Sequence, residues 1–269
     1  MIDEIGIIIV TYNPDEINFI FNLNKYIDSA SFIVVIDNSE KPYINEKLSN
    51  YSNVKCINTY DNVGIAKAQN IGIKYLMSQE NRINYLLFFD QDSYLTTLQI
   101  NELIKSFNEL KLKHRIALMA PGNNESKRYS FQKEVISSGS LISRNAIEDV
   151  GEMRDDFFID FVDYEWCWRA RSNKYEIVTD NSVKLSHQTD NPKRIFGKII
   201  SSPIRNYYFF RNSIYVMKHH LLVDSYVIFS FKMLKHLVFE VVFCGNKKKR
   251  IRYISHGIKD GILGNMGKL

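Results

Sequence analysis

Short runs of apolar and β-branched residues recur along the first 120 positions of the chain, at 5–10, 32–36, 54–58 and 85–89. Because these runs are largely apolar, we expect strands that are covered on both faces, as in a parallel sheet. Apolar residues recur at helical spacing between and after these runs, in segments 17–27, 65–77 and 98–112. The alternation of strands and helices predicts an α/β layer fold.

After position 120 the pattern becomes less regular. The segment "VISSGSLIS" at 135–143 predicts a strand pair or a loop. A helix is predicted for "DFVDYEWCWRARS" at 160–172, and a further strand for "YEIVTD" at 175–180. Beyond Pro203 the chain is aromatic and basic, and we expect a smaller helical appendage there.

Each of the four apolar runs is followed by a short polar segment, and the four segments are "TYN", "DNS", "DNVG" and "DQDS". The carboxyl ends of parallel strands meet at one edge of a sheet, where open α/β sheets bind their ligands. We therefore expect Asp37, Asp61, Asp90 and Asp92 to face a common crevice.

Asp90 and Asp92 are separated by one residue, so both side chains can point to the same side of the strand end. Mg²⁺ and Mn²⁺ are held by few carboxylates together with water and substrate phosphates. Such an ion would neutralise the charge on a departing diphosphate. As an isolated motif, however, D-x-D is more often an ordinary polar turn after a strand.

A second group of acidic residues lies in the helix predicted at 160–172. Asp160 and Asp163 are three residues apart, so we expect them to share a helix face. Glu165 and Arg169 have the i,i+4 spacing and order of a structural ion pair. Asp163 has no such local partner.

Several of these motifs occur together and in one order, namely "IIIVTYNP", "IDNSE", "NVGIAKAQNIGI", "FFDQDS", "SSGSLIS" and "FFIDFVDYEWCWRA". In this order the sequence resembles family 2 glycosyltransferases, and "SPIRNYYFFRNSIY" and "HGIKDGILGNMGK" make it most similar to the bacterial rhamnosyltransferase branch. The resemblance covers nearly the whole chain. It implies the GT-A fold, a Rossmann-like and mainly parallel sheet flanked by helices.

The resemblance also implies an activity. The expected reaction is inverting transfer of L-rhamnose from dTDP-rhamnose to a lipid-linked saccharide, in the synthesis of a cell-surface polysaccharide. Two alternatives remain open at this point: a family 2 transferase with another donor, such as UDP-glucose or UDP-galactose, and a non-catalytic subunit that binds a sugar nucleotide or a glycan. The absence of G-x-G-x-x-G disfavours a nicotinamide enzyme.

Site residues are implied by the same resemblance. Asp163 would be the catalytic base, at the second acidic position of the family's ED-x-E motif, where Val162 replaces the first acid. The cofactor would be Mg²⁺ or Mn²⁺, held by Asp92, Asp90 and His187. The nucleotide sugar would be bound by Thr11, Tyr12, Asn13, Asp37, Asn62, Asp90 and Arg205. A lone histidine is more often a packing or surface residue, and packing explains Arg205 equally well.

The implied organisation has a catalytic domain at residues 1–202 and a C-terminal region at 203–269. Within the first, residues up to about 120 would bind nucleotide and residues 121–202 the acceptor. In the second, residues 221–245 are apolar, but Lys232, His236 and Glu240 recur on one helix face. This predicts an amphipathic helix at a membrane interface, since a spanning helix needs about 20 apolar residues.

The basic block "NKKKRIRY" at 246–253 follows at once, and such blocks attract anionic lipid. Together they predict peripheral attachment to the inner face of the cytoplasmic membrane. Packing against the catalytic domain, or against another subunit of a homo-oligomer, is the alternative. No nucleic-acid partner is expected, because the block is single and no recognition motif accompanies it.

Composition adds little to this picture. The 45% hydrophobic and 24% charged content, with 12 Gly and 5 Pro, is typical of a folded soluble protein. The three cysteines have no C-x-x-C spacing, which predicts neither a disulfide framework nor a zinc site. The N-terminus is acidic and lacks a secretory signal, so we expect the protein in the cytoplasm.

Overall fold

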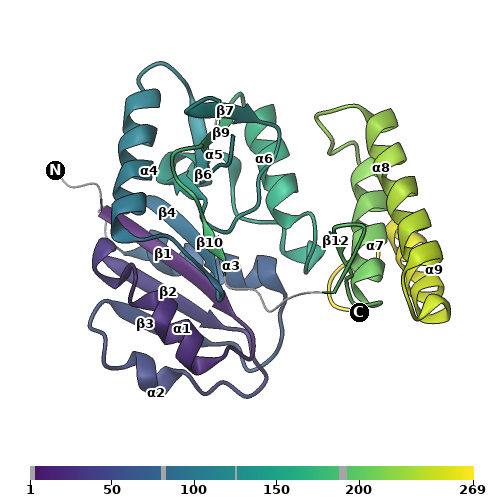
Figure 1. Ribbon diagram of the computed structural model, residues 1–269, viewed down its shortest axis with the longest axis horizontal. Coiled ribbons are helices and arrows are strands. Elements are labelled where there is room, and N and C mark those ends of the chain that lie inside the picture. The colour runs from purple at the N-terminus through teal and green to yellow at the C-terminus, as the bar shows by residue number, and fades with distance from the viewer. Residues whose placement is uncertain (1–3, 80–82, 125, 188–192) are drawn as a thin grey trace.

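The computed structural model describes residues 4–79, 83–124, 126–187 and 193–269, and in these ranges eight strands form one mixed sheet (Figure 1). The strand order across the sheet is β3-β2-β1-β4-β8-β6-β9-β7. In chain order the strands are β1 (Glu4–Thr11), β2 (Phe32–Asp37), β3 (Val54–Asn58), β4 (Ile83–Asp90), β6 (Ile116–Pro121), β7 (Tyr129–Gln132), β8 (Leu141–Ser143) and β9 (Glu176–Asp180).

Strands β3, β2, β1 and β4 are parallel neighbours, which confirms the four strands predicted from the apolar runs. Their register aligns the carboxyl ends. Thr11 pairs with Asp37, Asp37 pairs with Asn58, and Val10 pairs with Asp90. The polar segments that follow these strands therefore begin at the same edge of the sheet.

The other half of the sheet is less regular. From the segment 135–143 only the short strand β8 forms, and it runs antiparallel between β4 and β6. Strand β9 lies where the sequence predicts it, parallel to β6, and β7 is antiparallel to β9. A separate two-stranded ladder joins β5 (Ser93–Tyr94) to β10 (Ser186–His187).

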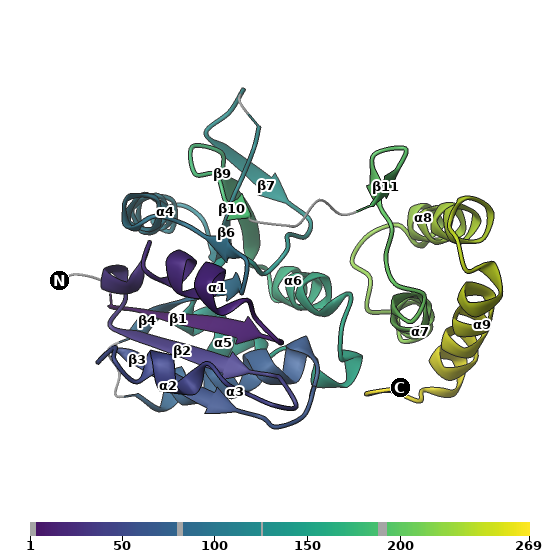
Figure 2. The same ribbon diagram turned by 60° about the horizontal axis from the view of Figure 1, so that its bottom comes forward.

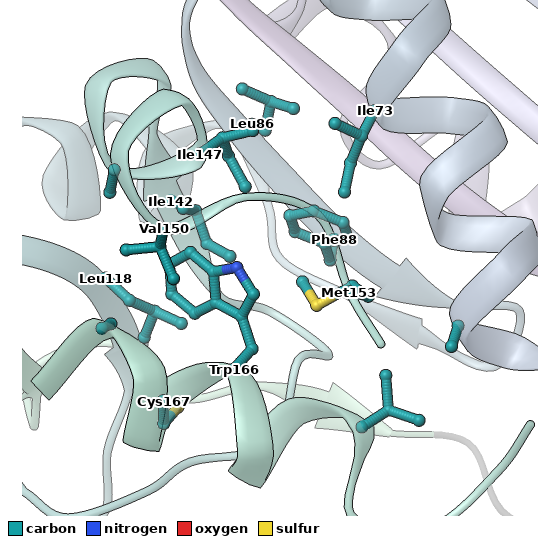
Figure 3. Close-up of a cluster of buried hydrophobic side chains, with 14 of the residues drawn as sticks. Ile73, Leu86, Phe88, Leu118, Ile142, Ile147, Val150, Met153, Trp166 and Cys167 are labelled. Carbon is teal, nitrogen blue, oxygen red and sulfur yellow. The ribbon is translucent and has the colours of Figure 1, made fainter. Parts of the chain in front are cut away.

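Helices cover both faces of the sheet (Figures 1 and 2). One face packs against α3 (Ile65–Ser78), α5 (Arg144–Val150) and α6 (Val162–Ser172), around a buried cluster that includes Phe88 and Trp166 (Figure 3). The other face packs against α1 (Glu16–Leu23), α2 (Asn45–Leu48) and α4 (Thr97–Leu110). Two short 3₁₀ turns, η1 (Ile27–Ser29) and η2 (Asp155–Phe157), connect elements. Because both faces are buried, the strands are apolar on both sides.

The chain beyond the sheet begins with a hairpin of β11 (Arg194–Ile195) and β12 (Lys198–Ile199). It continues in α7 (Arg205–Lys218), α8 (Tyr226–Val238), the π-helical turn η3 (Phe239–Phe243) and α9 (Lys247–Leu263). These helices pack together beside the sheet domain, as predicted for a helical appendage (Figure 1). The division of the chain at residue 202 stays a prediction.

Two details of the predicted helices are wrong. Helix α6 begins at Val162, so Asp160 lies outside it and does not share a helix face with Asp163. In the C-terminal region, Glu240 is not on a solvated polar face, because its side chain is buried and pairs with Arg250. Arg250 is therefore held inside the protein, away from the exposed part of the basic block.

None of the helices within the described ranges is long and apolar enough to cross a membrane.

Helices α7 and α9 approach closely at Gly257, where an added Cβ would overlap the carbonyl oxygen of Tyr207. We expect Gly257→Ala to push the helices apart and to lower the free energy of unfolding by about 1–3 kcal/mol. At Gly245 an added Cβ meets nothing within 4 Å, so Gly245→Ala is the matched control. Urea denaturation of both variants measures the difference, and equal midpoints would contradict the close packing.

Candidate active site

Thr11 and Asp37 lie side by side at the carboxyl edge of the sheet, and both are fully buried. Asp37 Oδ1 accepts hydrogen bonds from the backbone N–H of Ser39 (3.2 Å) and from its hydroxyl (2.6 Å). Within the described part of the chain, Asp37 Oδ2 and Thr11 Oγ1 have no hydrogen-bond partner. Buried polar atoms are seldom left unpaired. These two oxygens are therefore candidates for hydrogen bonds to a ligand.

The segment after β1 continues the same edge. The backbone N–H of Tyr12 donates to the side chain of Gln91 (2.7 Å), and that of Asn13 donates to Ser39 Oγ (2.7 Å). The side chains of Tyr12 and Asn13 are exposed. The contact to Gln91 ties the segment after β1 directly to "DQDS", so the two polar segments adjoin as predicted.

The "DNVG" segment contributes less than expected. Asn62 Oδ1 accepts from the backbone N–H of Gly64 (3.1 Å) and from the Asn38 amide (3.2 Å), so its oxygen shapes the turn before α3. Asp61 is exposed and pairs with Lys268 at 2.6 Å. Hydrogen bonding to that ammonium group holds the pKa of Asp61 below its usual range. Asp61 is thus neutralised by the C-terminal segment.

Asp92 and His187 are brought together by the ladder between β5 and β10, which pairs His187 with Ser93. His187 Nδ1 lies 3.4 Å from Asp92 Oδ1 and 2.6 Å from Ser93 Oγ. Asp90 lies close to both Asp92 and His187. Burial raises the pKa of Asp90, the negative charge of Asp92 raises it further, and His187 lowers it. A cation beside these carboxylates would relieve their repulsion.

Across the described residues, no three His, Cys, Asp or Glu side chains meet in a ready-made metal site. Two facing ligands, Asp92 and His187, nevertheless fit Mg²⁺ or Mn²⁺ bound together with a sugar nucleotide. Mg²⁺ in particular usually keeps several waters and takes one or two carboxylates plus substrate phosphates. The donor chemistry present therefore suits a metal ion that arrives with its diphosphate.

A pocket of ≈ 410 Å³ opens beside these residues, and its wall includes Asp90, Asp160, Asp163 and Arg205. Asp163 lies in the first turn of α6, and its Oδ2 accepts a hydrogen bond from the backbone N–H of Ser137 (3.1 Å). Burial raises the pKa of Asp163 to about 6. A carboxylate with that pKa is suited to general-base catalysis near neutral pH.

Arg205, the first residue of α7, is held against the pocket by Asp160. Its Nε and Nη2 reach Asp160 Oδ1 at 3.0 and 2.8 Å. Nε also reaches Asp160 Oδ2 at 3.3 Å, and several hydrogen bonds to one carboxylate fix the guanidinium plane more firmly than one. Arg205 is thus the cation of the pocket wall, with a carboxylate partner that sequence spacing does not reveal.

Asp160 owes its position to an unusual backbone. Phe158, Asp160 and Phe161 all have positive φ values of 64–66°, which non-glycine residues rarely adopt. The fully buried amide of Asn212 donates to the carbonyl oxygens of Phe157, Ile159 and Asp160 (2.9–3.2 Å). The adjacent Arg211 donates to Phe157 O at 2.7 Å. Helix α7 therefore holds this loop in shape.

Some residues of the pocket have no clear signal in the sequence. Gln69 is buried in α3, donates to Ser137 Oγ (3.1 Å), and has an Oε1 without a partner among the described residues. Ser138 Oγ accepts from the backbone N–H of Asp90 (3.1 Å). Only the resemblance carried by "SSGSLIS" marks the two serines, and nothing in the helical pattern distinguishes Gln69.

A larger groove of ≈ 710 Å³ lies at the opposite end of β4 and β6, lined by residues such as Lys111, Arg115 and Arg144. It is remote from the carboxyl edge, and the acids lining it, Glu148 and Asp149, both have arginine partners. The pocket of Asp163 is therefore the better candidate for the chemistry.

The chain belongs to glycosyl transferase family 2, whose model matches residues 6–176. It is 31% identical to the dTDP-rhamnosyl transferase RfbF of Shigella flexneri over 302 residues, covering 99% of this chain and 98% of that protein. It is 26% identical over 299 residues to the low-salt glycan biosynthesis hexosyltransferase Agl10 of Haloferax volcanii, covering 100% and 94%. The protein is accordingly a glycosyltransferase, similar to a dTDP-rhamnosyl transferase and to a hexosyltransferase of glycan biosynthesis.

Solved structures show the same fold. The structure of GalNAc-T7 with UDP, GalNAc and Mn²⁺ matches 97% of this chain with a TM-score of 0.65 and 14% identity, and the chain spans 56% of its length. The structure of residues 1–349 of S. aureus TarS with UDP-GlcNAc matches 96% of this chain and 81% of that one, with a TM-score of 0.55 and 15% identity. The GT-A fold expected from the sequence is confirmed.

The contacts of Asn212 lead to a prediction about the loop. We expect Asn212→Leu to leave the carbonyl oxygens of Ile159 and Asp160 without this donor, while Phe157 O keeps Arg211, and to lower the free energy of unfolding by about 1–3 kcal/mol. The amides of residues 158–161 should also exchange with deuterium faster. Asn173→Leu, which removes one exposed hydrogen bond to Arg169, is the control. Unchanged exchange in Asn212→Leu would show that the loop keeps its shape unaided.

Proposed function

We propose that the protein is a metal-dependent, inverting glycosyltransferase that moves a sugar, L-rhamnose from dTDP-rhamnose, to a lipid-linked saccharide. The observation that carries this proposal is the pocket in which Asp163 and Arg205 adjoin Asp90, beside the pair of Asp92 and His187. Similarity to RfbF over the whole chain supports the choice of donor.

In the transfer step, an acceptor hydroxyl oxygen attacks the anomeric carbon from the face opposite the diphosphate. The new C–O bond forms as the bond to the phosphate oxygen breaks, and dTDP leaves with the electron pair. The hydroxyl proton passes to the carboxylate of Asp163. Attack from the opposite face inverts the anomeric configuration. Asp163 faces the pocket from the first turn of α6, where an acceptor can reach it.

The donor nucleotide binds along the carboxyl edge of the sheet. The free Oδ2 of Asp37 accepts a hydrogen bond from the base or ribose, and Thr11 Oγ1 lies beside it. Tyr12, Asn13 and Asn62 line the same nucleotide site, while Arg205 and Asp90 lie nearer the sugar. Residues 1–120 thus serve the nucleotide and residues 121–202 the acceptor.

Asp92 and His187, with Asp90 beside them, would hold Mg²⁺ or Mn²⁺. When bound, the ion neutralises the charge that develops on the departing diphosphate. GalNAc-T7 was solved with Mn²⁺ together with UDP, which agrees with metal use on this fold. Ser93 Oγ lies 2.6 Å from His187 Nδ1 and so fixes the position of the imidazole ring.

The acceptor is carried by a lipid, so the enzyme acts at the inner face of the cytoplasmic membrane. The exposed lysines 247–249 at the start of α9 and the exposed apolar side chains of α8 support this attachment. Residues 203–269 form the membrane-associating region in this proposal.

Calorimetric titration of dTDP, UDP, GDP and CDP, with and without Mn²⁺, tests the donor site. We expect dTDP to bind most tightly and only in the presence of Mn²⁺. Asp92→Asn should reduce the metal-dependent affinity at least about tenfold, because the loss of one carboxylate ligand weakens the metal. Asp28→Asn, an exposed acid in η1, is the control. A preference for UDP would assign another donor, and no binding at all would refute the donor site.

A second prediction concerns Asp163. Asp163→Asn should leave dTDP binding intact but reduce transfer by at least about a hundredfold, since a positioned base contributes about 10²–10⁴-fold. In the unmodified enzyme kcat/KM should rise about tenfold per pH unit below pH 6 and level off above it, because only the deprotonated carboxylate accepts the proton. Substantial transfer by the Asn variant, or a profile flat through pH 6, would refute the role of base.

A further inference from the structure

Helix α8 is unusual because none of its thirteen residues is buried. Its exposed apolar side chains recur at helical spacing and continue into η3, in the order Val227, Ile228, Phe231, Leu234, Val238, Val242 and Phe243. This spacing places them along one face of the helix. A soluble helix normally turns such a stripe into the core, so the face of α8 lacks a covering partner within the described chain.

The hairpin of β11 and β12 stands beside α8 (Figure 2). Side chains of the hairpin and of α8 line a common groove. The hairpin's turn residues Phe196 and Gly197 both have positive φ, at 49° and 76°. A bulky residue is seldom used there, since such turns prefer Asn and Gly. Nonetheless Phe196 is held at the tip with 81% of its surface exposed, and its ring meets Phe243 edge-on at 5.2 Å.

The groove between the hairpin and α8 has a volume of ≈ 580 Å³. Its lining is mainly apolar, with Phe196, Phe231, Leu234 and Phe243 among the walls. Lys198 and Lys235 are its charged residues, and Lys198 Nζ lies over the Phe239 ring at 5.0 Å. A groove with an apolar lining, whose only charged lining residues among those described are these two lysines, matches a ligand that has an apolar chain and an anionic head.

Charge around the groove has the same sign. Residues 193–252 contain thirteen Lys and Arg against two acidic residues, in a chain whose net charge is only +5. Both acids are already paired, Asp224 with Lys133 and Arg171, and Glu240 with Arg250. A second copy of this chain would bring a like-charged surface to the groove, which disfavours it as the occupant.

We infer that the groove between the hairpin at 194–199 and the stripe of α8 binds the hydrocarbon chain of an anionic membrane lipid, with Lys198 and Lys235 at the lipid phosphate. This inference rests on the proposed action of the enzyme at a membrane. It adds a lipid-binding site at the groove between the hairpin and α8. An acyl or isoprenyl chain fills an apolar channel, and juxtamembrane lysines attract anionic headgroups. The site is separate from the pocket of Asp163.

The experiment uses the full chain and vesicles of phosphatidylcholine, alone or mixed 3:1 with phosphatidylglycerol whose chains carry bromine. Trp166 and Trp168 are buried, so the unmodified protein gives the baseline fluorescence. Phe196→Trp places a reporter at the groove, and Phe131→Trp, on the exposed strand β7, is the control. Brominated chains quench a tryptophan only on contact. We expect quenching of Trp at 196, none at 131, and none with phosphatidylcholine alone.

Two sets of variants test the walls and the rim. Leu234→Ser should weaken binding to the mixed vesicles about tenfold, because the bound lipid chain loses one apolar contact. Leu112→Ser, which changes an exposed leucine outside the groove, should not. Lys198→Gln with Lys235→Gln should remove the preference for phosphatidylglycerol, and the exposed Lys113→Gln should keep it.

Each opposite outcome overturns the inference. Binding to vesicles without quenching at position 196 would mean attachment by charge alone. No vesicle binding, with a dimer that Leu234→Ser dissociates in analytical ultracentrifugation, would assign the groove to a second copy. Binding of dTDP with Mn²⁺ is measured on the same samples. Its absence in the unmodified protein would contradict the proposed function without touching the lipid results.

Discussion

The arrangement of the site depends on the buried side chains Arg211 and Asn212 and on the carbonyl groups they hold in the loop before α6. Three residues of that loop adopt left-handed backbone conformations, each costing about 1–3 kcal/mol. Hydrogen bonds to a buried amide or guanidinium contribute about 0.5–3 kcal/mol each. The four contacts from α7, with the bond from Ile65 N–H to Phe158 O, are of the size needed to offset that strain.

The same contacts make the C-terminal helices part of the site. Arg205 enters the pocket from the start of α7, about two turns before Arg211 and Asn212 secure the loop that carries its partner Asp160. At the far end of the chain, the backbone N–H of Gly267 donates to Asp156 O (2.7 Å), and Lys268 pairs with Asp61. Movement of these helices would therefore displace the loop and Arg205 together.

Periodicity in the sequence was sufficient to predict the parallel strands and the acids beyond them. Buried strands need apolar residues on both faces, so the runs ending at Val10, Ile36 and Phe89 can be recognised as strands from the sequence. The acids that follow the last of these runs can then be placed at the edge of the sheet. The turn with positive φ values at Phe158 to Phe161 cannot be predicted from the sequence, because no glycine marks it. The side chains that stabilise it lie about fifty residues later in the chain. The residue pattern therefore predicts that helix α6 begins at Asp160, two residues too early.

The prediction of a polar face formed by Lys232, His236 and Glu240 is wrong for a related reason. Lys232, His236 and Glu240 have helical spacing, but spacing does not reveal whether a face meets water or a partner that satisfies it. Arg250 and the Asn206 amide bind Glu240 inside the protein, and the His236 ring lies 4.1 Å from that of Phe209. Lys232 stays exposed, and the apolar side chains of α8 such as Phe231 and Leu234 are exposed as well.

Charge in the pocket finally constrains what can enter it. Three carboxylates, those of Asp90, Asp160 and Asp163, share the wall with a single guanidinium, and Arg205 is already paired. With Asp163 deprotonated the wall carries an excess of negative charge. Burial is the main cause that raises the pKa values of Asp90 and Asp163, and the negative charge of Asp92 raises that of Asp90 further, as the charge of Asp90 does that of Asp163. A diphosphate brought alone to this wall would be repelled. A divalent cation removes that repulsion, so the electrostatics of the pocket supports the proposed metal dependence independently of the resemblance of its motifs.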